Sequence, residues 1–264
     1  MPEPLEFAID LAHQAGDLLQ NYFERANLDT QWKADHSVVT EADIAADELI
    51  STALRQAFPR DLLLSEELSP AASGEGQSEQ PGLWIIDPLD GTTNFSLGLQ
   101  YWGVLLTRLQ GGFPVLAVMY FPLVQELYTA QLGHGAALNG QTLAIASPDP
   151  RNRTTFFSCC SRTYKRYQVS VPYKTRILGS ASYSLCAVAR GIALVSFEAT
   201  PKIWDIAGGW LLIQEAGGAI ETLDGSQPFP VQLDRSYERQ NFPTLAAATP
   251  ALLQRSHSQI VPRW

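Results

Sequence analysis

One short segment, residues 84–95, constrains the fold of this chain more than any other part of its sequence. Its first residues, Trp84 to Ile86, form an apolar run that is typical of a buried strand. Pro88 has no N–H group, so we expect it to end the pairing of that strand. Gly91 tolerates backbone conformations that other residues avoid, and the chain can turn sharply there. The segment therefore predicts a buried strand that ends in a tight turn.

Two aspartates, Asp87 and Asp90, lie where this strand is expected to end. Two carboxylates this close repel each other unless a cation lies between them, and hard divalent ions such as magnesium bind carboxylate oxygens. If Gly91, Thr92 and Thr93 open a helix, their backbone N–H groups can hold a phosphate beside such ions. The same residues also suit an ordinary turn of the Asp-Pro-x-Asp-Gly type, which is the competing interpretation.

Acidic residues also accompany two other apolar stretches. Leu62 to Leu64 is a short apolar run shortly before Glu66 and Glu67, and Asp205 lies in the first turn of an apolar helical stretch. Because three acidic strand or helix ends can meet at one rim, we expect a single acidic cluster. The simpler interpretations are that Asp205 caps its own helix and that the two glutamates lie on the surface.

Hydrophobic periodicity and turn residues predict alternating helices and strands, so the fold class is α/β, in the broad α+β sense. Residues 5–23 and 40–58 repeat apolar side chains at helical spacing, and Thr40 and Asp43 fit a capping box at the start of the second helix. Residues 69–82 are rich in Ser, Gly, Glu, Gln and Pro and are expected to form a solvated loop or flap. The other expected elements are helices 182–190 and 205–216, the latter ending at Gly217-Gly218, and strands 102–109, 115–120, 126–130, 154–159, 176–178, 194–197 and 219–222, with turns at Gly111-Gly112 and Asn139-Gly140.

The formal net charge of −9 opposes binding to the phosphate backbone of nucleic acids, and we expect no basic stripe that would reverse this. An anionic substrate would then have to be attracted locally, by bound cations. Cys159, Cys160 and Cys186 make an odd count with two adjacent residues, which disfavours a disulfide framework and favours a reducing compartment. No apolar run approaches the length of a membrane span, and the N-terminal residues lack signal-peptide features. We therefore expect a cytoplasmic protein with no nucleic-acid or membrane partner.

These residues together resemble the inositol monophosphatase family, the magnesium-dependent, lithium-sensitive phosphatases of small phosphate monoesters. The resemblance rests on residues 84–95 and on Trp-Asp-Ile-Ala-Gly-Gly at 204–209 followed by 215–218, with weaker support from 38–43, 133–140 and 179–181. It implies a layered αβαβα sandwich and one phosphatase domain over residues 1–264, in two lobes that divide near 145–153. It also implies two to three Mg²⁺ ions, a small phosphorylated substrate and a homodimer.

The resemblance further implies a role for each matching residue. Direct attack of a metal-activated water on phosphorus would use Glu66 and Thr92, with Asp43 hydrogen-bonded to Thr92. The metal ligands would be Glu66, Asp87, the backbone carbonyl of Leu89, Asp90 and Asp205. The substrate would be bound by Asp90, Gly91, Thr92, Thr93, Gly179, Ser180, Ala181 and Glu198.

The chain departs from the family pattern at several positions. Ser65 stands where a glycine usually precedes the two glutamates, and Ser37 replaces an acid that commonly lies three residues before Thr40. Pro201 and Lys202 lie in a stretch that differs from the commonest version and are expected to flank the pocket for the alcohol. Inositol 1-phosphate, or a similar polyol or sugar phosphate, is the expected substrate. The alternatives are histidinol phosphate, a sugar bisphosphate, a 3′-phosphonucleotide and, from another class, a non-catalytic regulatory module that only binds anions.

Overall fold

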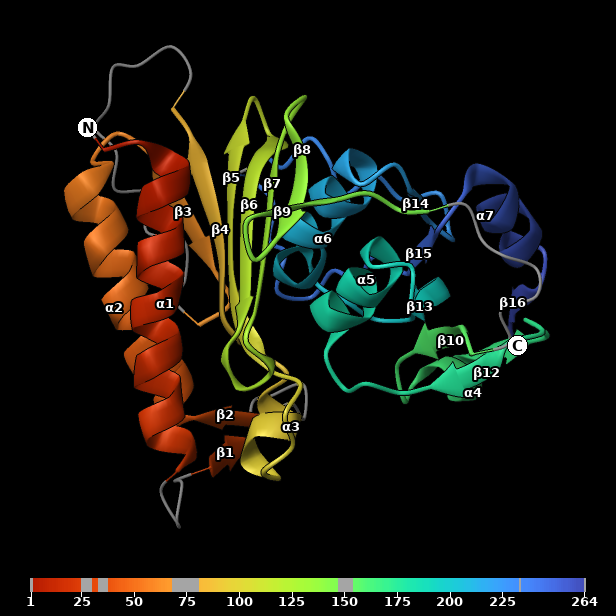
Figure 1. Ribbon diagram of the computed structural model, residues 1–264. Coiled ribbons are helices and arrows are strands. Elements are labelled where there is room, and N and C mark those ends of the chain that lie inside the picture. Colours follow the sequence, from red (N-terminus) through yellow and green to blue (C-terminus); the bar gives the residue numbers. More distant parts are fainter. Residues whose placement is uncertain are drawn as a thin grey trace.

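The structure is a computed structural model that describes residues 2–24, 30–32, 38–67, 81–146, 154–232 and 234–263. These ranges form five stacked layers, in the order helix, sheet, helix, sheet, helix (Figure 1). The αβαβα sandwich expected from the resemblance is therefore confirmed. Ser37, residues 69–80 of the expected flap and most of the expected division near 145–153 lie outside the described residues. No described helix combines the length and apolar character needed to cross a membrane.

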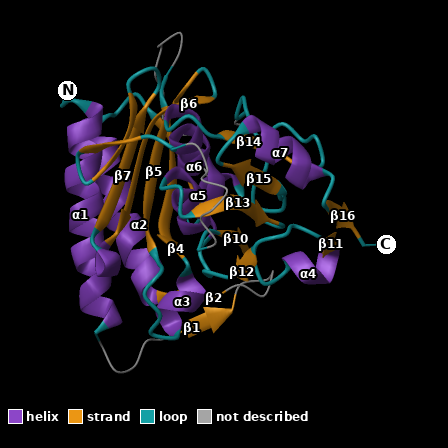
Figure 2. Ribbon diagram, turned by 45° about the vertical axis from the view of Figure 1, so that its right-hand side comes forward, coloured by secondary structure: helices purple, strands orange, loops and turns teal. Residues whose placement is uncertain are grey.

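The first layer contains two long helices, which the sequence predicted over residues 5–23 and 40–58. Figure 2 shows them side by side on one face of the larger sheet. The capping box at the second helix is present, since Oδ2 of Asp43 accepts hydrogen bonds from both the backbone N–H and the hydroxyl of Thr40. A small antiparallel pair of strands precedes this helix. The elements are α1 (Pro4–Phe23), β1 (Thr30–Trp32), β2 (Val38–Thr40) and α2 (Glu41–Ala57).

The second layer is a seven-stranded sheet with the order β3-β4-β5-β6-β7-β8-β9. Strands β3 and β4 are parallel, and all other neighbours are antiparallel. The strands are β3 (Leu62–Ser65), β4 (Leu83–Asp90), β5 (Gly103–Gln110), β6 (Phe113–Phe121), β7 (Glu126–Gln131), β8 (Gly135–Leu138) and β9 (Gln141–Leu143), with the short helices α3 (Thr92–Ser96) and η1 (Pro122–Val124) between them.

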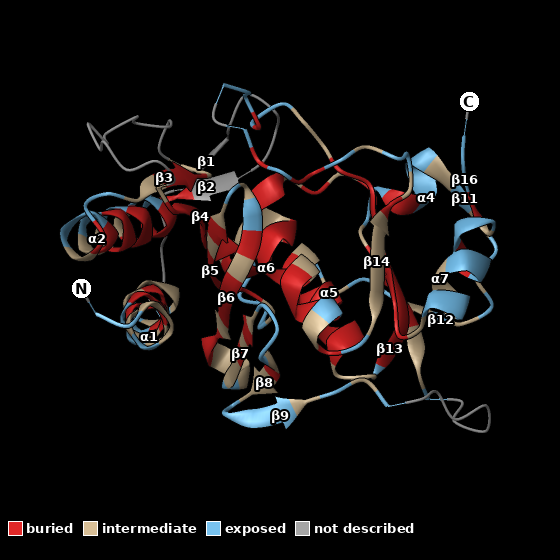
Figure 3. Ribbon diagram, turned by 90° about the horizontal axis from the view of Figure 1, so that it is seen from above, coloured by how far each residue is buried: buried red, intermediate tan, exposed pale blue. Residues whose placement is uncertain are grey.

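The third layer consists of α5 and α6, and a five-stranded sheet with the order β12-β10-β13-β15-β14 packs against it. Figure 3 shows buried residues along α5, α6 and the strands on either side of them. Helix α7 covers the outer face of the second sheet. The elements are β10 (Phe156–Cys159), α4 (Thr163–Arg166), β11 (Tyr167–Val169), β12 (Lys174–Arg176), α5 (Ala181–Ala189), β13 (Ala193–Glu198), α6 (Ile203–Glu215), β14 (Ala219–Thr222), β15 (Thr244–Ala247), α7 (Pro250–His257) and β16 (Ile260–Pro262).

The alternation of side chains along β4 decides which layer each residue meets. Trp84 and Ile86 pack into the core beneath α1 and α2, while Ile85 packs into the core beneath α5 and α6. Because successive strand residues point to opposite faces, Asp87 lies on the same face as Ile85. The carboxylate of Asp87 is thereby directed toward the layer that contains α6.

The expectation that Pro88 ends strand pairing is wrong. Strand β4 pairs with β5 as far as Asp87, and pairing resumes where Asp90 lies opposite Gly103. The irregularity between these two pairs is a bulge that accommodates the missing N–H group of Pro88. Asp87 lies opposite Leu105 and Asp90 opposite Gly103, so the extra residue of the bulge places both aspartates on the same face of the sheet although they are three positions apart.

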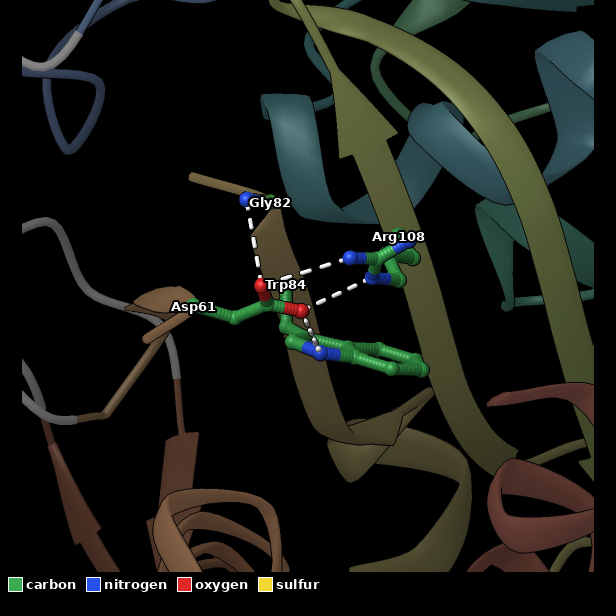
Figure 4. A network of polar contacts seen from close by, with 4 residues as sticks. All are labelled: Asp61, Gly82, Trp84 and Arg108. Atoms are coloured by element: carbon green, nitrogen blue, oxygen red, sulfur yellow. Dashed lines mark hydrogen bonds and ion pairs between the residues drawn. The ribbon is translucent and has the colours of Figure 1, made fainter. Parts of the chain in front are cut away.

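A partly buried ion pair fixes the other end of β4 (Figure 4). The carboxylate of Asp61 accepts from Nε of Arg108 at 2.8 Å, from Nε1 of Trp84 at 3.1 Å and from the backbone N–H of Gly82 at 3.1 Å. A Cβ atom at Gly82 would lie 2.6 Å from the Arg108 guanidinium and 2.7 Å from the carboxylate, so a larger residue would displace these two side chains from their present positions. The network joins the segment before β3 to β4 and β5.

Candidate active site

Three acidic side chains from separate elements converge at one edge of the larger sheet. One carboxylate oxygen each from Glu66, Asp87 and Asp205 lies within 4.8 Å of the other two. The register explains the first two: Ser65 lies beside Ile86 in the parallel pair, and the N–H of Glu66 bonds to the carbonyl of Ile86. Glu66 therefore leaves β3 level with Asp87. Helix α6 supplies Asp205, so the predicted acidic cluster forms from these three residues.

Asp205 both caps its helix and belongs to the cluster. Its Oδ2 accepts a 2.7 Å hydrogen bond from the backbone N–H of Lys202, the residue before α6. One oxygen of its carboxylate also lies within 4.8 Å of a carboxylate oxygen of Asp87. Burial, followed by the negative charges of Asp90 and Glu66, raises the pKa of Asp205 well above its ordinary value. Carboxylates this close repel each other when ionised, and a divalent cation between them would remove that repulsion.

Asp90 lies at the same edge but turns toward α5. Its Oδ2 accepts hydrogen bonds from Oγ of Ser180 at 2.5 Å, from the backbone N–H of Ser182 at 3.1 Å and from Oγ of Ser182. Burial raises the pKa of Asp90, although these hydrogen bonds lower it. Within the described ranges every hydrogen bond to Asp90 involves Oδ2, which leaves Oδ1 without one. Ser182 was missed by sequence analysis, because nothing near it in the chain marks a contact 92 residues away.

Gly91 and the first turn of α3 form the small, hydroxyl-rich turn after β4. Gly91 has φ +89°, and a Cβ there would lie 2.7 Å from the carbonyl oxygen of Tyr101, so a larger residue is excluded. Thr92 and Thr93 are the first residues of α3, and Gly91 precedes it as the N-cap, which is the helical alternative considered from the sequence. The first N–H groups of a helix have no partner within the helix.

The hydroxyl of Thr92 connects three parts of the site. It lies 3.1 Å from Oδ1 of Asp43 on α2 and 3.0 Å from the carbonyl oxygen of Leu89. The expected contact between Thr92 and Asp43 is therefore present. Burial raises the pKa of Asp43 to about 6, against the lowering effect of its hydrogen bonds with Thr40. Leu89 also donates its N–H to Oδ1 of Asp87, so the bulge residue links Thr92 to the acidic cluster.

A pocket of about 400 Å³ opens over this edge, which is a suitable size for a small ligand. The members of the predicted site that line it are Glu66, Asp90, Gly91, Thr92, Thr93, Gly179, Ser180, Ala181, Glu198 and Asp205. Asp43, Asp87 and Leu89 are not among its lining residues and lie behind that wall. Glu198 is buried, and its burial raises the pKa of its carboxyl group to about 8, against a hydrogen bond with Ser184.

Asn94 joins α3 to the segment before α5 beside this pocket. Its Nδ2 donates to the carbonyls of Tyr101 at 2.7 Å and Leu178 at 2.8 Å. Gly179 follows with φ +81°, and a Cβ there would lie 2.3 Å from Oδ1 of Asn94. Gly179 must therefore be glycine for the loop before α5 to approach α3, a role that its position before Ser180 alone did not indicate.

The pocket wall also contains residues that sequence analysis did not single out, namely Asn94, Cys160, Ser161, Arg162, Ile177 and Thr200. Pro201 lines the pocket, as expected, but Lys202 does not. The ammonium group of Lys202 instead donates to the backbone carbonyl of Glu238 at 2.5 Å. The expectation that Lys202 flanks the alcohol pocket is wrong, because a backbone carbonyl from a later loop holds its side chain.

Comparison with known proteins agrees with this arrangement. A family model described as the inositol monophosphatase family matches residues 1–259. Inositol monophosphatase 2 of Solanum lycopersicum is 33% identical over 86% of this chain and 90% of its own length. Nus factor SuhB of Pasteurella multocida is 34% identical over 85% of this chain and 87% of its own length. A histidinol-phosphatase of Chlorobaculum parvum is 34% identical, over 86% and 88% of the two chains.

Solved structures give the same result for the fold. The extragenic suppressor protein suhB of Bartonella henselae superimposes with a TM-score of 0.81 at 26% identity, over 96% of each chain. An IMPase/NADP phosphatase, solved as a complex with Mg²⁺ and phosphate, has a TM-score of 0.74 over 95% of this chain and 93% of its own. At 22% identity the second likeness concerns the fold alone.

Proposed function

Since this chain belongs to the inositol monophosphatase family, a family of phosphatases, we propose that it is a Mg²⁺-dependent phosphatase of small phosphate monoesters. Inositol 1-phosphate, or a similar polyol or sugar phosphate, is the proposed substrate. The observation that carries this proposal is the convergence of Glu66, Asp87 and Asp205 at a pocket that also exposes Gly91, Thr92 and Thr93. Acidic groups for a cation and backbone donors for a phosphate thus share one pocket.

The residues at this edge fit a magnesium site. All three convergent side chains are carboxylates, and their ligand oxygens lie within 4.8 Å of one another, an arrangement that a divalent cation would stabilise. Oδ1 of Asp90 and the carbonyl of Leu89 lie beside them and complete the proposed ligand set for two to three ions. When bound, Mg²⁺ would polarise the phosphoryl group and lower the pKa of a water molecule.

The chain's own groups would position that water and remove its proton. Glu66 lines the pocket, and Thr92 stands between the pocket and Asp43. A threonine hydroxyl can donate one hydrogen bond and accept another, so it can join the water to the buried carboxylate. With its pKa raised to about 6, Asp43 is closer to neutrality than an ordinary aspartate and better matched to accepting a proton. We therefore assign Glu66 and Thr92 to the water and Asp43 to its support.

The opposite wall would receive the alcohol. The backbone at Gly179 and Ala181 and the carboxyl group of Glu198 line that side of the pocket. The hydroxyl of Ser180 holds Asp90 and accepts from the N–H of Tyr183, so we assign it to positioning Asp90 rather than to direct contact with the alcohol. Glu198, with its pKa raised to about 8, can donate a hydrogen bond to a substrate oxygen near neutral pH.

Histidinol phosphate, a sugar bisphosphate and a 3′-phosphonucleotide are the alternative substrates. The histidinol-phosphatase among the relatives favours the first of these. The alternative from another class is a non-catalytic regulatory module that binds anions, which the name of the Nus factor relative supports. We also propose a cytoplasmic homodimer that lithium inhibits. Gel filtration with light scattering tests the dimer, and LiCl added to the phosphatase assay tests the inhibition.

A panel of phosphate esters, assayed for released phosphate with and without Mg²⁺, tests the proposal. The panel contains inositol 1-phosphate, histidinol phosphate, fructose 1,6-bisphosphate and adenosine 3′,5′-bisphosphate. We expect Mg²⁺-dependent release that is fastest with inositol 1-phosphate or another polyol or sugar phosphate. Absence of release from every ester at millimolar Mg²⁺ would contradict the proposal and favour the regulatory alternative.

A further inference from the structure

Asn94, on the short helix α3, is a buried polar residue to which the proposed reaction gives no task. It lines the pocket together with the turn at Gly91, where the phosphate would bind, and with the loop at Gly179, where the alcohol would bind. A buried amide generally forms hydrogen bonds, because an unpaired one costs free energy. The partners of this amide therefore indicate the role of Asn94.

The amide of Asn94 bridges two backbone carbonyls that belong to opposite walls of the pocket. Its Nδ2 donates to the carbonyl of Tyr101 at 2.7 Å and to that of Leu178 at 2.8 Å. The Tyr101 carbonyl covers the phosphate turn, since a Cβ at Gly91 would lie 2.7 Å from it. Leu178 directly precedes Gly179. One side chain thus connects the turn for the phosphate to the loop for the alcohol, across 84 positions in the chain.

The fit of the amide between these two segments is close. A side-chain amide has two N–H donors, and on Asn94 each of them has its own carbonyl. A Cβ at Gly179 would lie 2.3 Å from Oδ1 of Asn94, so the alcohol loop rests directly on the amide. A side chain of the same shape without N–H groups would leave both carbonyls unpaired. The contact therefore depends on the hydrogen-bond donors of Asn94 as well as on its size.

The loop at Leu178 and Gly179 is held differently from the helix that follows it. Asp90 accepts hydrogen bonds from Ser180 and Ser182, and the ring of Tyr183 stacks on that of Tyr101 with centroids 4.6 Å apart. These contacts fix the start of α5. Residues 177–179 lie between β12 and α5, and of the described side chains Asn94 is the one that hydrogen-bonds to them. Loss of this contact would release the loop and leave Asp90 and α5 in place.

We propose that Asn94 is a positioning residue for substrate specificity, which holds the alcohol loop at a fixed separation from the phosphate turn. The inference rests on the proposed phosphatase function and concerns the same pocket. A loop that is fixed before the substrate arrives loses less conformational entropy on binding than a loop that must be ordered by the substrate. Asn94 therefore favours esters whose alcohol contacts the loop, and it contributes little to the binding of phosphate alone.

Two constants measured in one assay at millimolar Mg²⁺ separate the two walls. The KM for inositol 1-phosphate depends on both walls, whereas the inhibition constant of inorganic phosphate depends on the phosphate side alone. The variant is Asn94→Leu, which keeps the branched shape of the side chain and removes both N–H donors. The matched control is Ser96→Ala, which removes a 3.0 Å hydrogen bond to the carbonyl of Thr93 within the same helix and does not line the pocket.

We expect Asn94→Leu to raise the KM for inositol 1-phosphate by about tenfold or more, as the loss of two buried hydrogen bonds predicts. The inhibition constant of phosphate should change by less than about twofold, and Ser96→Ala should match the wild type in both constants. Equal losses in the two constants of Asn94→Leu would overturn the inference, since Asn94 would then support the phosphate turn or the whole fold. An unchanged KM would overturn it as well.

A double-mutant cycle tests the same contact from the other side and does not need Asn94→Leu to fold. Gly179→Ala should also raise the KM for inositol 1-phosphate, because the added Cβ meets the amide oxygen of Asn94. Asn94→Ala removes that oxygen, so the double variant should lose little more than Asn94→Ala alone. Fully additive losses would show that the two residues act independently and would contradict the inference.

Failure of the proposed function would be visible separately. If the wild type releases phosphate from no ester, that function fails, and calorimetric titrations with inositol 1-phosphate and with inorganic phosphate, both at millimolar Mg²⁺, decide the role of Asn94. A weaker affinity of Asn94→Leu for inositol 1-phosphate alone would support the inference. Affinities for inositol 1-phosphate that are equal in the variant and the wild type, or losses that are equal for both ligands, would contradict it.

Discussion

The hydroxyl of Ser65 donates a 2.9 Å hydrogen bond to Oδ1 of Asp47, a buried residue of α2. The same oxygen accepts a 3.1 Å hydrogen bond from Ser51, one turn further along α2. Ser65 ends β3 and directly precedes Glu66. A contact between residues 18 positions apart thus fixes the backbone that carries one of the three convergent acids. The serine that replaces the usual glycine here ties the proposed metal site to the helix layer.

Removing the hydrogen bond between Ser65 and Asp47 should lower the affinity for Mg²⁺ more than it lowers kcat. We expect Ser65→Ala to raise the Mg²⁺ concentration for half-maximal activity by about three- to tenfold, as the loss of one buried hydrogen bond predicts. The kcat at saturating Mg²⁺ should stay near that of the wild type. Ser51→Ala is the control, since it removes a bond to the same oxygen but leaves Ser65 in place. Equal Mg²⁺ midpoints for the two variants would contradict the claim that the hydrogen bond of Ser65 positions Glu66.

Replacing Asp90 by Asn should lower the phosphatase activity without lowering the stability of the metal-free protein. In Asp90→Asn we expect phosphate release to fall by about a hundredfold or more, the loss that follows removal of a charged group from a reaction centre. The melting temperature of the metal-free protein should stay near the wild-type value or rise, because burial and the charge of Glu66 disfavour the ionised carboxylate. Activity close to the wild type would remove Asp90 from the mechanism.

The stability of the metal-free protein should fall as the pH rises. Burial raises the pKa of Glu198 from 4.5 to about 8 and that of Asp43 from 3.8 to about 6. At a pH between its unfolded-state pKa and its folded-state pKa, each carboxyl group keeps a proton in the folded protein that it releases in the unfolded protein. The stabilisation from this proton is complete below the unfolded-state pKa and is lost as the pH rises through the folded-state pKa. In that pH range each group can lower the free energy of unfolding by up to about 1.4 kcal/mol per pH unit.

Urea unfolding in EDTA at a series of pH values measures this effect. The Glu198→Gln variant is the comparison, because an amide stays neutral over the whole range. We expect it to remove much of the loss of stability above about pH 6, in line with the raised pKa of Glu198. A free energy of unfolding that increases from acidic to neutral pH in the wild type would contradict the assignment.

The Asp61 network should matter for stability and not for metal affinity. Asp61→Ala leaves the guanidinium of Arg108 and the indole N–H of Trp84 without their carboxylate partner. We expect the free energy of unfolding to fall by about 2 kcal/mol, between the cost of breaking an exposed ion pair and that of breaking a buried one. Urea unfolding measures this value, and a calorimetric Mg²⁺ titration of the folded variant should match the wild type. A weakened Mg²⁺ affinity would show that the network also shapes the site.

The sequence predicted those parts of the structure that depend on local patterns. Residues 5–23 form a helix because their apolar side chains repeat at helical spacing, and α6 ends before Gly217, which has φ +87°. The acidic cluster was also predictable, because β3 and β4 end at the same edge and α6 begins there. A strand of three residues, such as β12, was misplaced by two residues, since so short a run contains little periodic signal.

Contacts that join distant parts of the chain were not predictable. Ser182 reaches Asp90, and Arg162 lines the pocket, only because α6 packs against both α5 and the larger sheet. The bulge at Pro88 depends on β5 continuing to pair with Asp90 through Gly103. In each case the contact depends on tertiary packing, and the residues nearby in the sequence contain no pattern that predicts it.

Calorimetric titration of Mg²⁺ into the protein in the presence of phosphate tests the proposed metal site most directly. Wild type should bind Mg²⁺ saturably, and Asp87→Asn and Asp205→Asn should each weaken binding by about tenfold or more, since each removes a charged ligand. Glu48→Gln, which removes an exposed acid of α2, should bind as the wild type does. Unchanged Mg²⁺ affinity in both aspartate variants would contradict a shared site built from Glu66, Asp87 and Asp205.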